Sequence, residues 1–352
     1  METERVLGQN HIMKHFENAI KMEKISHAYI INGEEGSGKM RLAVQFAKAL
    51  QCEDNNPQEE EPSGFDFLQE EAKSKEPTGI ACGHCRSCKQ TDSKNQPDIK
   101  YITYEKTGIG VDEIREQINE DIDILPYSSR YKIYIVPDSE KMTVQAQNAL
   151  LKTIEEPPEY AIIILLTTNA DVFLQTILSR CVLLNIRPVK ESLIKNQLMS
   201  EYGIGDYEAG VAVAFANGNP GKAIKLATSE DFRELKKLVI GTLISFNNGG
   251  MEAISAAVKS AGEFKKQIGE YFNLMRIWFR DILVYKAIRM DEKLIFQDDY
   301  MVIKEMSEKF SFYDLDMIFK SIEQAEHRVS SNVNFDMTIE ILFLAIRERI
   351  RK

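Results

Sequence analysis

The stretch that decides the fold is GEEGSGK at residues 33–39, which follows a short apolar run and opens a segment with helical spacing. The pattern G-x-x-x-x-G-K in that position is typical of a phosphate-binding loop between a strand and a helix. In such a loop, the glycines (here Gly33, Gly36 and Gly38) let backbone N–H groups converge on phosphate oxygens, and the lysine (Lys39) reaches the terminal phosphates. The sequence therefore predicts a nucleotide loop in an α/β fold.

The regions around this loop alternate between short apolar segments and helical ones, a pattern that indicates a parallel sheet with helices on both faces. Pro157 and Pro158 cannot continue a helix, so the helix before them should end there. The sequence predicts strands at 28–31, 99–104, 132–136, 161–166 and 181–186, and helices at 39–50, 111–125 and 144–154.

The second half of the chain has a different character. Strand signals stop after Pro188, and the remaining residues have the apolar spacing of helices, with long ones at 264–289 and 335–350. The sequence GNPG at 218–221 marks a break between two short helices. We therefore expect three domains: an α/β domain at 1–186, a small helical domain at 187–232 and a larger all-α domain at 233–352.

The composition of the 352 residues is that of a globular protein, with 43% hydrophobic and 28% charged residues. The longest uninterrupted apolar run, 161–166, is far too short to cross a bilayer, and residues 1–5 lack the apolar stretch of a signal peptide. We therefore expect a cytoplasmic protein with no membrane partner. The net charge of -10 argues against a protein that grips nucleic acid with its whole surface, because phosphates attract clustered Lys and Arg.

The nucleotide loop lacks parts that ATP hydrolysis needs. The residue after Lys39 should be a Ser or Thr whose hydroxyl holds magnesium, but it is Met40. Downstream, Asp138 can still approach a metal, whereas the position that should carry a water-orienting carboxylate is Ser139. Glu140 should point elsewhere if the strand continues that far, since successive strand side chains face opposite ways. We therefore expect no independent hydrolysis, and either weak nucleotide binding or a loop that persists as a packed turn, with its lysine solvated or bound to carbonyls.

Four of the five cysteines have an orderly spacing. Cys82, Cys85 and Cys88 form a C-x2-C-x2-C run, and Cys52 ends the helix that follows the loop. In a chain without an export signal, this spacing indicates metal ligands rather than disulfides. Four thiolates suit a closed, tetrahedral, structural zinc site; an iron–sulfur cluster and free thiols are the alternatives. The segment between Cys52 and Cys82, residues 54–76, has the acidic composition of a mobile loop.

Five short motifs occur in an order that resembles the clamp-loader branch of AAA+ proteins, over about the first 227 residues. They are VLGQ at 6–9, SHAY at 26–29, NALLKTIEEPP at 148–158, LTTN at 166–169 and SRC at 179–181. The resemblance implies an AAA+ domain with a parallel sheet, followed by a small helical lid domain and a helical collar domain that joins subunits into a ring. The four cysteines are similar to the zinc module that bacterial members of the family carry.

Within this family, the resemblance leaves a choice between the ATP-hydrolysing gamma/tau type of subunit and the delta-prime type, which lacks a working site. Met40 and Ser139 favour the delta-prime type, and so does Gly221, which stands where a hydrolysing subunit would have its sensor-2 arginine. From the family, Arg180 in the SRC motif is expected to be an arginine finger that reaches the ATP site of an adjacent subunit. The alternative for Arg180 is an ordinary surface ion pair.

The resemblance thus implies a non-hydrolysing subunit of the DNA polymerase III clamp loader, which serves DNA replication. Its partners would be gamma/tau and delta clamp loader subunits and, through the assembly, the sliding clamp and primer-template DNA. A rival from a different class is a zinc-dependent DNA-binding protein that uses the nucleotide fold only as a scaffold. The net charge of -10 disfavours that rival.

Overall fold

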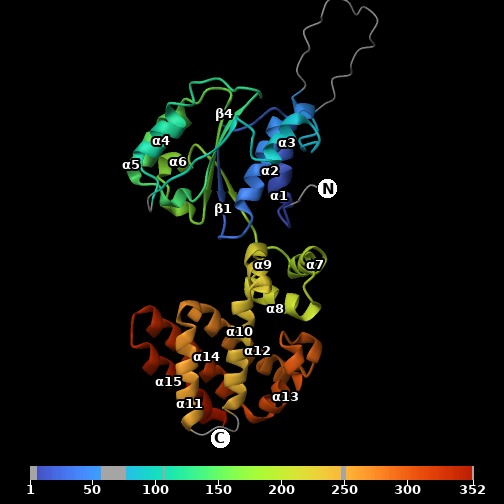
Figure 1. Ribbon diagram of the computed structural model, residues 1–352, viewed down its shortest axis with the longest axis vertical. Helices are drawn as coiled ribbons and strands as arrows, with labels where there is room; N and C mark the ends of the chain where they lie inside the picture. The colour runs from blue at the N-terminus through green and yellow to red at the C-terminus, as the bar shows by residue number, and fades with distance from the viewer. Residues whose placement is uncertain (1–5, 57–76, 106–107, 247–250, 351–352) are drawn as a thin grey trace, which may run out of the picture. The chain divides into compact units, whose positions relative to one another are not determined.

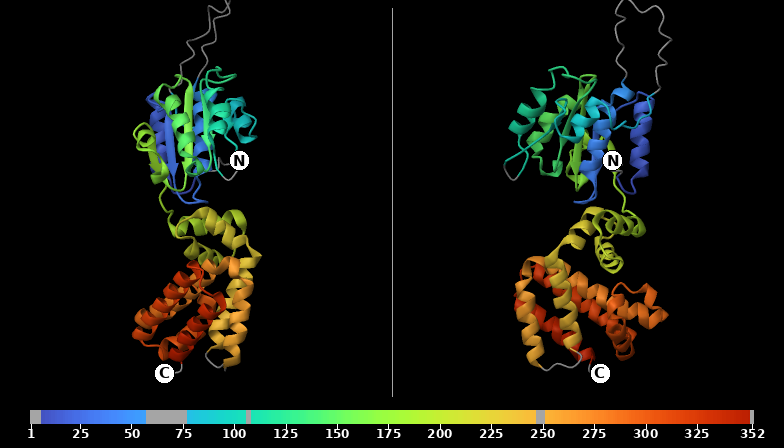
Figure 2. Two further views of the ribbon diagram at one scale, coloured as in Figure 1. Left: turned by 90° about the vertical axis from the view of Figure 1, so that its left-hand side faces the viewer. Right: turned by 45° about the vertical axis from the view of Figure 1, so that its right-hand side comes forward.

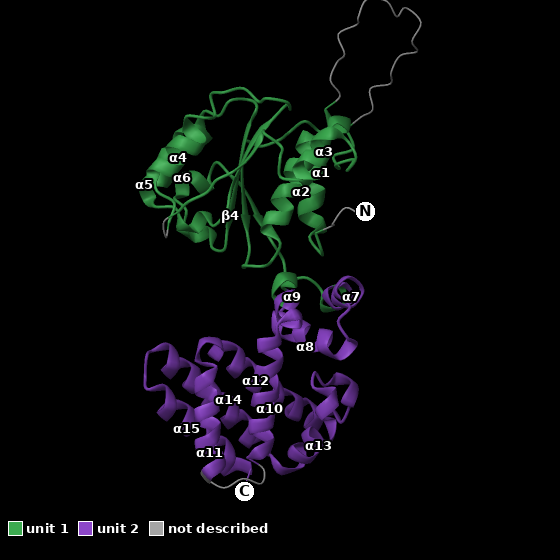
Figure 3. Cartoon of the chain, in the orientation of Figure 1, with its two compact units in different colours: residues 1–193, 219–222 green, residues 194–218, 223–352 purple. Residues whose placement is uncertain are grey.

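The structure is a computed structural model that describes residues 6–56, 77–105, 108–246 and 251–350. Most of the predicted acidic loop, residues 57–76, lies outside the described residues. The chain separates into two compact units, the first made of residues 1–193 with 219–222 and the second of residues 194–218 with 223–352 (Figure 3). The division into three domains stays a prediction.

Five parallel strands form the centre of the first unit, in the order β2-β3-β4-β1-β5. Because β1 is paired on both sides, the glycine loop that follows it emerges from the interior of the sheet. The strands are β1 (Ala28–Asn32), β2 (Ile99–Tyr101), β3 (Lys132–Val136), β4 (Ala161–Thr167) and β5 (Val182–Asn185). The predicted α/β fold class is confirmed.

Helices cover both faces of this sheet (Figures 1 and 2). They are α1 (Asn10–Lys21), α2 (Lys39–Gln51), α3 (Arg86–Asp92), α4 (Val111–Ile114), α5 (Val144–Glu155) and α6 (Gln175–Leu178). Successive strand residues point to opposite sides, so each face has its own apolar core. Tyr29 and Ile31 pack with residues of α1 and α2, whereas Ala28 and Ile30 pack with residues of α4 and α5.

The helix predicted at 111–125 is shorter and less regular than expected. It passes after four residues into a π-helical turn, Arg115–Asn119, and then into hydrogen-bonded turns up to about residue 123. The ammonium of Lys132 on β3 donates to the backbone carbonyls of Asp121 and Ile124, at 2.6 and 3.0 Å. Both carbonyls are therefore bound by a strand lysine, and that of Asp121 also accepts from the N–H of Ile124 at 3.1 Å, an arrangement that apolar spacing does not reveal.

Two other predicted boundaries differ from the structure. The strand predicted at 99–104 ends at Tyr101, because Thr103 exchanges both of its backbone hydrogen bonds with the side chain of Gln117. The helix predicted at 264–289 is a regular α-helix only from 268 to 288. The remaining predicted strands and helices agree with the structure to within about two residues.

Asp121 anchors the turn after α4 to the sheet. Its carboxylate accepts hydrogen bonds from Lys100 Nζ at 2.5 Å, from Lys132 Nζ at 2.8 Å and from the hydroxyl of Tyr134 at 2.8 Å. Burial raises the pKa of Asp121, but the hydrogen bonds from the two lysines and the tyrosine outweigh burial and hold the pKa below its ordinary value of 3.8.

We expect Asp121→Asn to lower the free energy of unfolding by about 3 kcal/mol near neutral pH, because Lys132 is buried and loses its counter-charge. Since the folded-state pKa of Asp121 is depressed, its carboxylate stabilises the fold above pH 3.8, and this contribution is lost as the pH falls below that value. Urea unfolding of both proteins at a series of pH values measures the difference. The difference in free energy of unfolding between the two proteins should decrease on acidification. A difference that stays constant with pH would refute the ion-pair account.

The second unit consists of helices throughout its described residues, packed around large apolar side chains that include the fully buried Trp278. The helices are α7 (Glu191–Tyr202), α8 (Asp206–Ala216), α9 (Pro220–Thr228), α10 (Glu230–Ser245), α11 (Met251–Glu263), α12 (Ile268–Ile288), α13 (Tyr300–Lys309), α14 (Phe312–Ser330) and α15 (Phe335–Ile350). The first three residues of α7 and of α9 belong to the first unit. The predicted break at 218–221 covers residues between α8 and α9 and the first two residues of α9. Within the described parts of the chain, we find no helix with the length and apolar character needed to span a membrane.

Candidate nucleotide loop and metal centre

The glycine loop joins β1 to α2, the context that the sequence predicts. Gly36 and Gly38 have φ angles of +78° and +97°, which glycine adopts without the steric penalty of other residues. The N–H of Leu42 donates to the carbonyl of Gly38, so α2 begins where the loop ends. Gly33, Gly36, Gly38 and Lys39 therefore form one continuous loop at the N-terminus of a helix.

The ammonium of Lys39 binds the loop itself. Its Nζ donates to the backbone carbonyl of Gly33 at 2.6 Å and to that of Glu34 at 2.9 Å. Burial lowers the pKa of Lys39, and the negative charges of Glu140 and Asp138 act in the opposite direction. Of the arrangements considered for a packed turn, the structure has the one in which the lysine binds carbonyls.

Asp138, the candidate metal ligand, is held by two neighbouring side chains. It follows β3 in the left-handed conformation, with a φ of 47°. Its Oδ2 accepts hydrogen bonds from the hydroxyl of Tyr104 at 2.6 Å and from Lys141 Nζ at 3.1 Å. The Tyr104 hydrogen bond is the largest cause of its lowered pKa, and Lys141 adds to it. A metal ion at Asp138 would have to compete with Lys141.

Ser139 cannot take the place of a catalytic carboxylate. Its side chain is fully buried, and its Oγ donates to the carbonyl of Leu166 on β4 at 2.8 Å. A hydroxyl that is already used as a donor inside the sheet does not face a water molecule and does not accept a proton near neutral pH. The residue therefore ties the turn after β3 to β4.

Glu140 lies in a turn after β3 rather than on the strand. β3 ends at Val136, and residues 139–141 form a short 3-10 turn, so the strand does not continue as far as Glu140. The carboxylate of Glu140 accepts hydrogen bonds from the N–H and the hydroxyl of Thr168, at 3.2 and 2.9 Å. It is also the strongest of the charges that raise the pKa of Lys39. The expectation that Glu140 points elsewhere assumed that the strand continues to this residue, and β3 ends before it, so strand alternation does not determine its direction.

Sequence reasoning missed the contacts that residues 219–222 make with the loop, within the same unit. Asn219 Nδ2 donates to the carbonyl of Glu35 at 2.7 Å, and the N–H of Gly221 donates to the carbonyl of Gly36 at 3.0 Å. An Asn directly before a Pro is a typical helix start, so a local signal was present. Nothing local identifies its partner, which lies 184 residues away in the sequence.

Arg180, the candidate arginine finger, follows α6 and is exposed. Its Nη2 lies 3.1 Å from Glu155 Oε1, and its Nη1 donates to the carbonyl of Thr176 at 3.1 Å. The side chains of Arg180 and Glu155 are 42% and 44% exposed, and a pair of this kind contributes about 0–1 kcal/mol. The guanidinium can therefore leave Glu155 at little cost. Its role in a neighbouring site stays a prediction.

The four spaced cysteines lie together. The sulfur atoms of Cys52, Cys82, Cys85 and Cys88 all lie within 4.8 Å of one another, and that of Cys82 is 3.9 Å from that of Cys88. Around a tetrahedral ion with metal–sulfur bonds of about 2.3 Å, sulfur atoms lie about 3.8 Å apart. Disulfide sulfurs would be only about 2.05 Å apart. The geometry therefore fits a metal ion.

Backbone N–H groups prepare these sulfurs for a cation. The N–H groups of Cys82, Cys85 and Cys88 donate to the sulfurs of Cys52, Cys82 and Cys85 respectively, at 3.3, 3.4 and 3.3 Å. The side chain of Cys88 also donates to Cys52, which lowers the pKa of the Cys52 thiol to about 5. The same hydrogen bond raises the pKa of the Cys88 thiol, so it favours the thiolate form of Cys52 alone. The backbone N–H groups favour the thiolate form, which is the form that binds a metal.

Asn55 closes the base of the cysteine module. Its Nδ2 donates to the carbonyls of Ala49 and Ile80, at 2.9 and 3.2 Å. Its Oδ1 accepts hydrogen bonds from the hydroxyl of Thr78 and the N–H of Gly79, at 3.3 and 3.2 Å. One buried side chain thus joins the end of α2 to residues 78–80.

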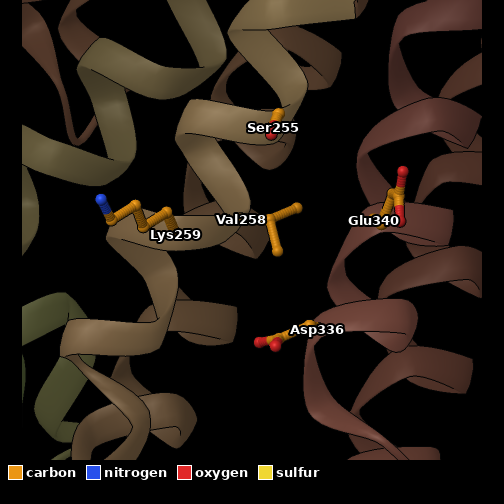
Figure 4. Close-up of a pocket in the computed structure, with 5 residues that line it drawn as sticks. All are labelled: Ser255, Val258, Lys259, Asp336 and Glu340. Atoms are coloured by element: carbon orange, nitrogen blue, oxygen red, sulfur yellow. The ribbon is translucent and has the colours of Figure 1, made fainter.

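A shallow pocket of about 320 Å³ lies in the second unit, between α11 and α15. Figure 4 shows that Lys259 extends away from Glu340 and that Asp336 comes from a different turn of α15 than Glu340. The pocket is lined by Ser255, Val258, Lys259, Asp336 and Glu340. These charges do not converge on one point, so the pocket does not form a specific ion site.

Comparisons with known proteins agree with the motifs of the first unit. The family model described as DNA polymerase III, delta subunit, matches residues 8–190, and the model of its C-terminal part matches residues 242–348. The chain is 27% identical to subunit delta' of DNA polymerase III from Bacillus subtilis, over 97% of this chain and 96% of that one. It is also 27% identical to subunit tau of the same organism, over 96% of this chain and 60% of tau.

A solved structure of a DNA polymerase III gamma subunit-related protein from Thermotoga maritima has 21% sequence identity and a TM-score of 0.44, over 96% of this chain and 99% of that one. The family assignment does not depend on that structure, because the first family model alone spans more than half of the chain. The chain belongs to the DNA polymerase III delta subunit family, in agreement with the clamp-loader resemblance of its motifs.

Proposed function

We propose that this chain is a non-hydrolysing clamp loader subunit of the delta-prime type. The observation that carries the proposal is Ser139, which is fully buried and bound to Leu166 at the position where hydrolysis requires a carboxylate. Met40, which follows the loop lysine, offers a thioether instead of a magnesium-binding hydroxyl. The similarity to subunit delta' of Bacillus subtilis, over nearly the full length of both chains, supports the same conclusion.

The chain would be a subunit that keeps one conformation, while the other subunits of the loader use ATP to open the sliding clamp and close it on primed DNA. Its direct partners would be gamma/tau and delta subunits, joined through the helices of the second unit. Its chemical contribution would be Arg180, whose guanidinium stabilises charge that develops on a phosphoryl group bound by the neighbouring subunit. The exposure of Arg180 and its weak pairing with Glu155 support this role.

The metal in the cysteine module would be a structural zinc ion, held by Cys52, Cys82, Cys85 and Cys88. Sulfurs within 4.8 Å of one another suit a single ion. In an iron–sulfur cluster, several iron atoms and sulfides separate the thiolates, which places the cysteine sulfurs farther apart. Four protein ligands complete a tetrahedron and leave no open position, so zinc would stabilise the module and take no part in catalysis.

A gamma/tau type of ATPase is the second candidate, because subunit tau of Bacillus subtilis has the same 27% identity over 96% of this chain. The two candidates differ in ATP turnover. We expect the purified chain to show no turnover and no magnesium-dependent ATP binding, because Met40 and Ser139 supply neither the metal ligand nor the water-orienting group.

Calorimetric titration with ATP, with and without magnesium, and a phosphate-release assay measure both properties. Lys39→Ala is the matched control, since turnover that persists in this variant comes from a contaminant. Magnesium-dependent binding together with turnover that is lost in Lys39→Ala would favour the gamma/tau type and reject the proposal.

A further inference from the structure

Residues 219–222 fit against the glycine loop at a point where only glycine has room. A Cβ atom added to Gly221 would lie 2.5 Å from the carbonyl oxygen of Gly36 and 2.8 Å from its Cα. Both atoms belong to the backbone, so no flexible side chain can move aside. The absence of a side chain at Gly221 therefore permits the hydrogen bond of 3.0 Å from its N–H to Gly36.

The constraint is reciprocal. Gly36 has a φ of +78°, and a Cβ at this position would lie 3.1 Å from Asn219 Oδ1 and 3.3 Å from the N–H nitrogen of Lys222. Two glycines that are far apart in the sequence thus make one close backbone contact. Gly221 is needed for space, whereas Gly36 is needed mainly for its left-handed conformation.

Asn219 uses its whole side chain in this contact. Its Nδ2 donates to the carbonyl of Glu35 at 2.7 Å, and its Oδ1 accepts from the N–H of Lys222 at 3.1 Å, which caps the start of α9. Only 5% of the residue is exposed. A single amide therefore starts the helix and binds its first turn to the loop.

These contacts and those of Lys39 use four consecutive carbonyls of the loop. Gly33 and Glu34 accept from Lys39 Nζ, Glu35 accepts from Asn219, and Gly36 accepts from Gly221. A phosphate-binding loop holds its ligand with N–H groups, so a nucleotide would satisfy none of these carbonyls. The chain itself therefore supplies the hydrogen-bond donors for these four carbonyls.

We propose that the glycine loop is an internal latch, closed on residues 219–222, whose shape does not depend on nucleotide. The inference rests on the proposed non-hydrolysing role, because a subunit that does not cycle ATP requires a loop that keeps one form. Gly221 allows the close backbone contact of the latch, and Asn219 supplies its side-chain hydrogen bonds. Gly221, which stands where a hydrolysing subunit would have its sensor-2 arginine, instead binds the glycine loop.

Hydrogen–deuterium exchange of the full chain, read by mass spectrometry over residues 33–39 and 219–222, tests the latch. In the wild-type chain, both segments should exchange at rates that magnesium and ATP do not change. In Gly221→Ala, both segments should exchange at least about tenfold faster. Gly241→Ala is the matched control, because a Cβ at Gly241 has no neighbour within 4 Å, and exchange at both segments should stay at the wild-type rate.

Asn219→Asp keeps the test decisive if Gly221→Ala does not fold. The aspartate still caps α9 through its carboxylate, but it loses the donor to Glu35 and brings a negative charge close to Glu34, whose Oε2 lies 3.4 Å from Asn219 Nδ2. It should also speed exchange at both segments. Unchanged exchange in both variants, or protection of the wild-type loop that increases with ATP, would overturn the latch. ATP turnover with an ATP-insensitive loop would instead reject the proposed function and leave the latch standing.

Discussion

Arg180→Ala is expected to reduce ATP hydrolysis at the adjoining site of the reconstituted loader by about 10³-fold or more, while ATP binding at that site changes little. The reason is that a guanidinium supplied from a second chain acts on charge that exists only in the transition state. In a single-turnover experiment with clamp and primed DNA present, the amount of ATP hydrolysed in the fast phase should fall by the contribution of one ATP site. Turnover unchanged by Arg180→Ala would reject the finger.

Glu155→Gln is the matched control for that experiment. It breaks the only ion pair that the described residues give to Arg180, yet it leaves the guanidinium in place. Because an exposed pair contributes at most about 1 kcal/mol, hydrolysis should stay within about fivefold of the wild-type rate. Arg180→Lys should recover only a small part of the loss, since a lysine lacks the planar, forked donor geometry. A structural role of Arg180 would instead affect Arg180→Ala and Glu155→Gln equally.

Cys88→Ser is expected to abolish metal binding, from one zinc ion per chain to none. Cys88 is fully buried, and its sulfur lies 3.9 Å from that of Cys82, so the substitution removes one of the four thiolates of a closed site. Structural zinc sites contribute on the order of 10 kcal/mol of apparent binding free energy, part of which stabilises the fold. We expect the unfolding midpoint of the first unit to fall by roughly 10 °C.

Metal analysis and cobalt substitution measure this loss directly, because cobalt bound to thiolates has a characteristic charge-transfer absorption. Cys181→Ser is the matched control. Cys181 lies outside the cluster, and burial raises the pKa of its thiol to about 12, so it is no candidate ligand. The control should keep its zinc. Zinc retained by Cys88→Ser, or acid-labile sulfide in the wild-type chain, would contradict the assignment.

The parts of the fold that sequence alone predicts are those that short-range patterns determine. The continuous apolar strand at 161–166 lies at the centre of the sheet, where both faces are buried, and its pattern identifies it without ambiguity. The helix before Pro157 ends at Glu155, because proline excludes helical geometry there. The cysteine cluster was found for the same reason, since three of its four ligands lie within seven residues of sequence.

The features that sequence reasoning missed depend on partners distant in the sequence. The helix at 111–125 is interrupted by carbonyl contacts from Lys132, and the position of Glu140 depends on a turn that follows a buried strand. The bond from Asn219 to Glu35 joins residues that no periodicity relates. In each case a side chain or backbone group satisfies a hydrogen-bonding partner that only the folded chain brings near.

The hydrogen bonds of Asn55 have a consequence for protein engineering. Asn55 holds Thr78 and Gly79 directly, so the described residues on the two sides of 57–76 are joined to each other by one side chain. The entropy of closing such a loop grows only logarithmically, by about 0.6 kcal/mol for each doubling of its length. A peptide tag or a fluorescent reporter inserted between residues 57 and 76 should therefore leave the sheet, the latch and the cysteine cluster undisturbed. This segment is a suitable place to label the subunit inside its assembly.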